Sequence, residues 1–122
     1  MNGNRLLLDT NIIIYALKGI NNVKPYFEEI PFISVVTEIE ILGVKDLSKL
    51  EVDIREIAIE TCTIIPLTNK IIQRVIEIKR EHKVLVPDAI IAATAIEEEL
   101  TLVTADKGFK RIKNLKLLLI DV

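Results

Sequence analysis

Short apolar runs alternate along the chain with longer segments in which apolar residues recur at helical spacing. The runs predict strands and the periodic segments predict helices. Strands are expected over residues 5–8, 32–35, 63–67, 101–104 and 115–120. Helices are expected over residues 11–18, 23–30, 37–44, 46–62 (starting around Asp46 or Ser48), 68–79 (with Thr68 as N-cap) and 89–99, with a short turn or helix at 107–112. Because strands and helices alternate, we expect an α/β fold: one three-layer α/β/α domain, residues 1–122, with a mainly parallel sheet.

Composition narrows the class of protein. Half of the 122 residues are apolar and only 4% are aromatic, so the core is built from aliphatic side chains and base-stacking tryptophans are excluded. The single cysteine, Cys62, excludes an internal disulfide and a multi-cysteine zinc site. No apolar stretch reaches the roughly 18 residues that span a membrane, so we expect a soluble cytoplasmic protein. A net charge of −2 leaves no global basic field, and nucleic acid would need a local patch or a metal.

Four acidic residues stand where predicted strands end or helices begin. Asp9 and Asp106 directly follow strands, while Glu40 and Asp88 lie on helices that leave the same edge of the sheet. In α/β sheets ligands bind at this edge. Each acid also has an ordinary interpretation: a helix cap for Asp9, a helix N-terminus for Asp88, a turn before Gly108 for Asp106 and a solvated helix face for Glu40. These interpretations predict no common arrangement, whereas a shared site does.

Carboxylates gathered at one edge repel each other unless a cation lies among them. Oxygen ligands select Mg²⁺ or Mn²⁺ over zinc. Such an ion neutralises a phosphodiester and activates water, so no histidine base is needed. The one histidine, His82, lies among charged residues at a helix end, where a solvated position is expected, and Cys62 is expected to be buried and structural.

Four segments resemble the sequence blocks of PIN-domain ribonucleases, and within them the VapC-like toxins of toxin–antitoxin pairs. The segments are residues 7–11, 33–43, 86–95 and 102–109, of which the third is the most specific. The resemblance implies that Mg²⁺ or Mn²⁺ is bound, directly or through water, by four catalytic acids, namely Asp9, Glu40, Asp88 and Asp106. It further implies that Asn11, Ser34 and Thr104 orient the ligands. Glu38 competes for the second position, but Glu40 is favoured because it stands three residues before Gly43.

The resemblance implies a metal-dependent endoribonuclease that leaves 5′-phosphate and 3′-hydroxyl ends, is silenced by an antitoxin protein and forms a homodimer. Beside Asp106, the basic residues Lys107, Lys110 and Arg111 are expected to contact RNA, with a solvated basic face as the alternative. The apolar helices before Pro31 and after Asp46 would, on the same grounds, form the antitoxin groove and the dimer surface. The RNA target is not encoded in any pattern of the sequence.

Three alternatives are open at this stage. A phosphoacceptor receiver domain has similar size and acids, but needs an aspartate at the end of its central strand. The strand at residues 63–67, taken as central, ends in Pro66 and Leu67 without an acid, which argues against a receiver. A catalytically inactive PIN fold that binds RNA or protein is the second alternative. The third is an RNA-processing nuclease outside any toxin–antitoxin pair.

Overall fold

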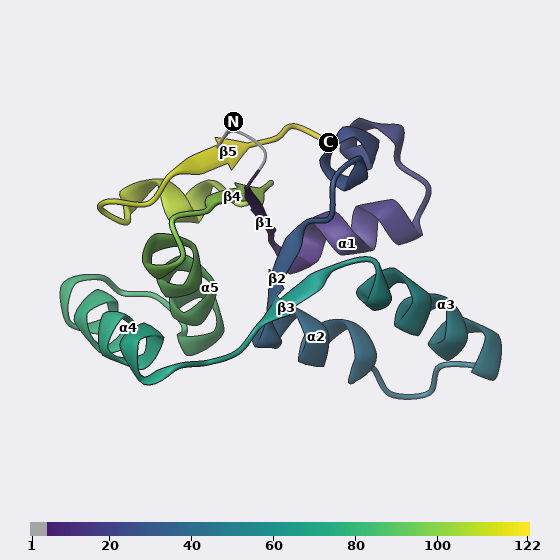
Figure 1. The fold of residues 1–122 in the computed structure, drawn as a ribbon, viewed down its shortest axis with the longest axis horizontal. Coiled ribbons are helices and arrows are strands. Elements are labelled where there is room, and N and C mark those ends of the chain that lie inside the picture. The colour runs from purple at the N-terminus through teal and green to yellow at the C-terminus, as the bar shows by residue number, and fades with distance from the viewer. Residues whose placement is uncertain (1–4) are drawn as a thin grey trace.

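A parallel β-sheet forms the centre of the computed structural model, which describes residues 5–122 (Figure 1). Its strands are β1 (Leu6–Leu8), β2 (Phe32–Ser34), β3 (Thr63–Ile65), β4 (Thr101–Thr104) and β5 (Leu117–Leu119). They lie in the order β3-β2-β1-β4-β5. Every pairing is parallel, with Leu7 opposite both Phe32 and Leu102. The α/β class predicted from the sequence is confirmed, and the sheet of the described residues is parallel throughout.

The strand at the middle of this sheet is β1, and β3 lies at an edge. Taking residues 63–67 as the central strand was therefore wrong, because the crossovers place β2 and β3 successively outward on one side of β1 and β4 and β5 on the other. The central strand in fact ends at an acid, Asp9. The receiver alternative fails for another reason: that fold has the order 2-1-3-4-5, which this sheet does not have.

Helices cover both faces of the sheet. In Figure 1, α1 (Thr10–Leu17), α2 (Val35–Leu42) and α3 (Lys49–Glu60) lie to the right of β1, and α4 (Asn69–Glu81) and α5 (Val86–Glu97) lie to the left. Neighbouring residues of β1 face opposite sides, as strand geometry requires. Leu7 packs into a cluster with residues of α4 and α5, while Leu8 packs into a second cluster with residues of α1 and α3. The three-layer arrangement follows from these two clusters.

Several element boundaries differ from the predicted ones for local reasons. The helix expected to start around Asp46 or Ser48 begins at Lys49 with Ser48 as its N-cap, because Asp46 has a φ of 64° and Ser48 forms a capping box with Glu51. Residues 23–30 were expected to be helical, and the chain forms the 3₁₀-helix η2 (Asn21–Phe27), which contains Pro25. A second 3₁₀-helix, η3 (Lys107–Arg111), lies at the expected turn. Within residues 5–122, no helix is both long enough and apolar enough to cross a membrane.

Candidate active site

Asp9 follows the central strand and is held by three donors. Its side chain is only 6% exposed. One carboxylate oxygen caps α1 by accepting the backbone N–H of Thr10 at 2.8 Å. The other accepts the Thr104 hydroxyl at 2.6 Å and the Asn11 amide at 3.2 Å. The ordinary capping role is thus present, but it uses one oxygen, while the second oxygen links β1 to the end of β4.

Thr104 and Asn11, to which the resemblance gives the role of orienting the ligands, both donate to Asp9 in the structure. The Thr104 hydroxyl that donates to Asp9 also accepts the backbone N–H of Asp106 at 3.0 Å. Asp106 in turn accepts the backbone N–H of Gly108 at 2.8 Å and caps η3. One hydroxyl therefore fixes the carboxylate of Asp9 and the backbone that carries Asp106, so the ends of β1 and β4 form one rigid unit.

Glu40 reaches the site through two threonines that the sequence analysis did not single out. The Thr10 hydroxyl donates to Glu40 Oε1 at 2.6 Å and lies 3.0 Å from the Thr37 hydroxyl. Because the Thr10 proton is directed to Glu40, Thr37 supplies the proton of the second bond. The available signal was spacing, since Thr37 precedes Glu40 by three residues and shares its helix face. The competitor Glu38 makes no such bond with Thr10 or Thr37.

Ser34 acts on the start of α2. It is 1% exposed, and its hydroxyl accepts the backbone N–H of Val36 at 3.0 Å, which caps the helix. Among the described residues, its hydrogen bond runs to this helix end and not to any of the four acids. Ser34 therefore sets the position of α2, and through it the position of Glu40.

Asp88 is the third residue of α5 and completes a group of mutually repelling acids. Burial raises the pKa of Asp88 above its ordinary value, and the charges of Asp106 and Glu40 raise it further. Burial also raises the pKa of Asp9; the Thr104 hydroxyl and the Thr10 N–H oppose that rise, and the charges of Asp88 and Asp106 add to it. Four acids from four separate parts of the chain thus share one electrostatic field.

The donor set suits a hard divalent cation. It consists of carboxylate oxygens with threonine and asparagine side chains around them, and Mg²⁺ and Mn²⁺ prefer such oxygen ligands. Within residues 5–122, no three histidine, cysteine, aspartate or glutamate side chains are arranged so that they hold a metal ion together. The four carboxylates feel each other's charge without converging on one point.

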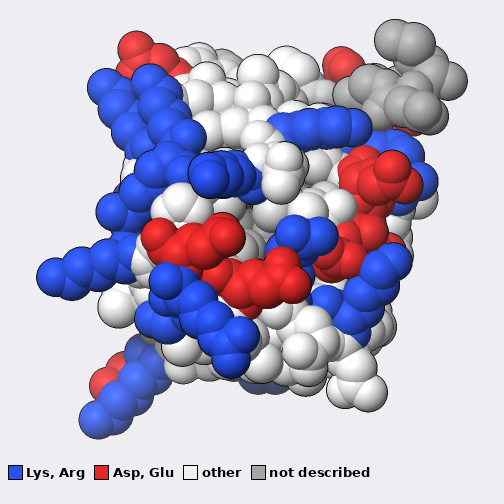
Figure 2. Space-filling model, turned by 90° about the vertical axis from the view of Figure 1, so that its left-hand side faces the viewer, with Lys and Arg blue, Asp and Glu red and all other residues white. Residues whose placement is uncertain are grey.

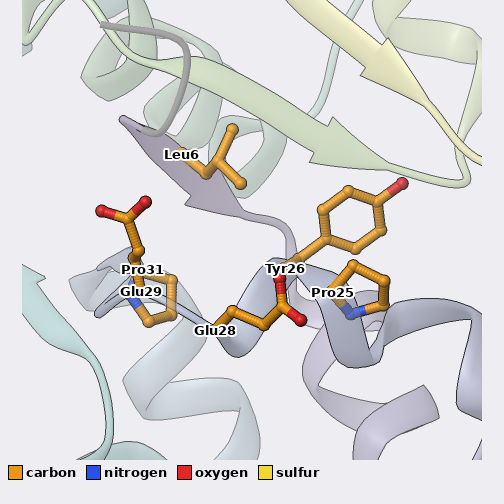
Figure 3. A pocket seen from close by; sticks show the side chains of 6 residues that line it. All are labelled: Leu6, Pro25, Tyr26, Glu28, Glu29 and Pro31. Atoms are coloured by element: carbon orange, nitrogen blue, oxygen red, sulfur yellow. The ribbon is translucent and has the colours of Figure 1, made fainter. Parts of the chain in front are cut away.

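Two pockets differ in their relation to these acids. One is lined by Asp88 and Asp106 together with Phe109 and Arg111. The other lies beside the start of β1, with Leu6 on one side and Tyr26 and Glu28 of the η2 region on the other (Figure 3). None of the four acids lines the second pocket. It begins at the opposite end of β1 from Asp9 and is not part of the acidic site.

The comparisons with known proteins agree with this fold. The sequence matches the PIN domain family over residues 6–115. It is 31% identical to a chain of a toxin–antitoxin complex from Klebsiella pneumoniae, with a TM-score of 0.79 over 93% of this chain and 95% of that one. VapBC2 from Rickettsia felis, bound to a fragment of its promoter DNA, gives 29% identity and a TM-score of 0.83, with 95% and 98% covered. DNA-bound VapBC from Salmonella typhimurium gives 21% identity and a TM-score of 0.84, with 93% of this chain and 96% of that one covered. No curated protein matches. The family resemblance expected from the sequence is confirmed.

Proposed function

The chain belongs to the PIN domain family and is VapC-like, and from this premise we propose that it is a Mg²⁺- or Mn²⁺-dependent endoribonuclease, the toxin of a toxin–antitoxin pair. The observation that carries the proposal is the acidic group at the edge of the sheet. There, burial and mutual repulsion raise the pKa values of Asp9 and Asp88. Without a cation, placing these acids close together would only destabilise the protein, because their negative charges repel one another.

In this proposal Asp9, Glu40, Asp88 and Asp106 hold the ion directly or through bound water, because the four carboxylates do not converge on one point in the structure. When bound, the ion neutralises the phosphodiester and lowers the pKa of a bound water. The protein's own contribution is orientation. Thr104 and Asn11 fix the direction of the Asp9 carboxylate, and Thr10 fixes that of Glu40. Such outer contacts are typically worth 10- to 100-fold in metal affinity or activity.

Two alternatives within the family are less well supported. An inactive binding module has no need of four acids, and all four are present here with the hydroxyls that orient two of them. An RNA-processing nuclease outside a toxin–antitoxin pair would share the site. The solved relatives favour the toxin, because the proteins from Klebsiella pneumoniae and Rickettsia felis were captured in toxin–antitoxin or VapBC assemblies.

The activity is tested by incubating the purified protein with total cellular RNA and either Mg²⁺ or Mn²⁺. We expect discrete fragments with 5′-phosphate ends, which a 5′-phosphate-dependent exonuclease degrades further. The reaction should stop in EDTA and return when excess cation is added. RNA cleavage that continues undiminished in EDTA contradicts the proposal. A lack of cleavage with both Mg²⁺ and Mn²⁺ also contradicts it.

An apolar face on α2 and α3 supports the antitoxin part of the proposal. Leu50, Ile54 and Ile57 recur at i, i+4 and i+7 on α3 and are 68%, 46% and 61% exposed. Ile39 on the neighbouring α2 is 66% exposed. Contiguous exposed apolar side chains mark a protein–protein contact, and an amphipathic helix is a common occupant. We assign this face to the antitoxin. Homodimer formation stays a prediction.

Substituting Ile57 by Lys is expected to weaken antitoxin binding by about 10- to 100-fold, because a charge replaces an apolar contact in the middle of the interface. Binding of the proposed antitoxin is measured by calorimetry, with RNA cleavage by the free variant as a check on folding. Glu56→Lys on the same helix serves as the control for added positive charge. Equal affinity for Ile57→Lys and Glu56→Lys would remove this face from the interface.

A further inference from the structure

A basic groove begins next to the acidic site and runs along the end of α4. Its cavity volume is about 660 Å³. The lining comes from the end of α4, the connection to α5, the start of α5 and η3, and consists of Lys79, His82, Lys83, Val84, Leu85, Asp88 and Arg111. Three basic side chains, Lys79, Lys83 and Arg111, thus share this lining with one acidic side chain. Figure 2 shows the side of the molecule that carries α4, where Lys and Arg side chains flank a band of acidic ones.

The groove and the acidic site are continuous. Val84, Asp88 and Arg111 line both this groove and the pocket that contains Asp106. A chain-like ligand that places one phosphate among the acids therefore has a path from Asp88 toward Lys79 and Lys83. Lys107 and Lys110, expected from the sequence to contact RNA with Arg111, do not line this groove.

Hydrogen bonds hold the wall of the groove in place. Lys79 donates to the backbone carbonyl of Val84 at 2.5 Å, and Arg111 donates to that of Lys83. Both bonds tie the α4–α5 connection to its neighbours, so the connection is pre-organised. Leu85, which is 74% exposed, adds an apolar surface among these cations. Cations that track a phosphate backbone, beside apolar surface for bases, are the features of a groove for a nucleic-acid strand.

We propose that this groove binds the RNA strand next to the cleaved bond, with Lys79, Lys83 and Arg111 on its phosphates. The proposal rests on the proposed nuclease function, whose site it extends. It gives the α4–α5 connection the role of positioning substrate, while the acids perform the chemistry.

Binding is measured by fluorescence anisotropy with a short labelled single-stranded RNA in EDTA, where cleavage does not interfere, over a series of salt concentrations. For Lys79→Ala/Lys83→Ala we expect about 10-fold weaker binding and a log–log salt slope shallower by about 1.4, because two phosphate contacts are lost. Lys18→Ala/Lys24→Ala, outside the groove, is the matched control.

Cleavage with Mg²⁺ separates this proposal from the function it extends. If the wild type cleaves RNA, Lys79→Ala/Lys83→Ala should raise KM and leave kcat unchanged. Cleavage by the wild type, together with a groove variant that matches the Lys18→Ala/Lys24→Ala control in affinity and salt slope, overturns the groove and leaves the nuclease intact. Groove-dependent binding without any cleavage by the wild type overturns the nuclease and leaves the groove.

Discussion

Asp88→Asn is expected to lower RNA cleavage about 10³-fold while the protein stays folded. The substitution removes one negative charge from the ligands of the proposed cation, and a loss of about 4 kcal/mol of transition-state stabilisation corresponds to that factor. The fold should tolerate it because Asp88 lies at the start of α5, where an amide has nearly the same shape as a carboxylate. Single-turnover cleavage at saturating Mg²⁺ measures the effect, and circular dichroism checks the fold.

The matched control is Asp53→Asn, which removes an acid of the same size from the exposed face of α3. There Asp53 pairs with Lys49 at 3.3 Å and has no contact with the acidic site. An exposed pair of this kind contributes about 0–1 kcal/mol, so the control should cleave at the wild-type rate. Asp9→Asn is expected to behave like Asp88→Asn. If Asp88→Asn cleaves RNA as fast as Asp53→Asn, Asp88 is not a ligand of a catalytic cation.

The positions of the acids were predictable because they depend on secondary structure alone. A carboxylate that follows a strand of a parallel sheet lies at the edge where the other strands also end, which places Asp9 and Asp106 together. The same argument applies to helices that leave this edge and predicts that Glu40 and Asp88 lie near it; in the structure the charges of Asp106 and Glu40 raise the pKa of Asp88. The local signals at Thr68 and Ser48 were equally informative, since each caps a helix in the structure.

The acid that each orienting hydroxyl contacts could not be predicted from the local pattern, because these contacts join residues far apart in the chain. Thr104 donates to a residue 95 positions away, and Thr10 donates to a residue 30 positions away. The direction of a hydroxyl is set by such neighbours and not by the local pattern. The predicted position of β3 in the sheet was wrong for a related reason. A sequence gives the order of strands along the chain, while the crossovers decide their order in the sheet.

Adding Mn²⁺ or Mg²⁺ should raise the melting temperature of the protein at pH 7 by an amount on the order of 10 °C. A ligand that binds only the folded state at about 100 times its dissociation constant contributes about 2.7 kcal/mol, which gives a shift of this size for a domain of this length. Differential scanning calorimetry at constant ionic strength, with NaCl replacing the divalent salt, separates specific binding from screening.

The pH dependence follows from the raised pKa values of Asp9 and Asp88. Below the unfolded-state pKa of about 4, both acids are protonated in both states and their contribution to stability is fully present. That contribution is lost as the pH rises through the folded-state values, so the metal-free protein carries uncompensated repulsion at pH 7. The cation binds the deprotonated acids, and its stabilising effect should therefore grow over the same pH range and vanish near pH 4.

Asp88→Asn tests this linkage without any measurement of activity. Without metal at pH 7 the variant should melt slightly above the wild type, on the order of 1–2 °C, because Asp88 is partly solvated and the repulsion it adds is screened. With metal it should gain much less than the wild type, because one ligand is missing, whereas Asp53→Asn should gain as much. A shift that is equal in Asp88→Asn and the wild type would place the cation elsewhere, and no shift with either cation would leave the acidic group without its proposed partner.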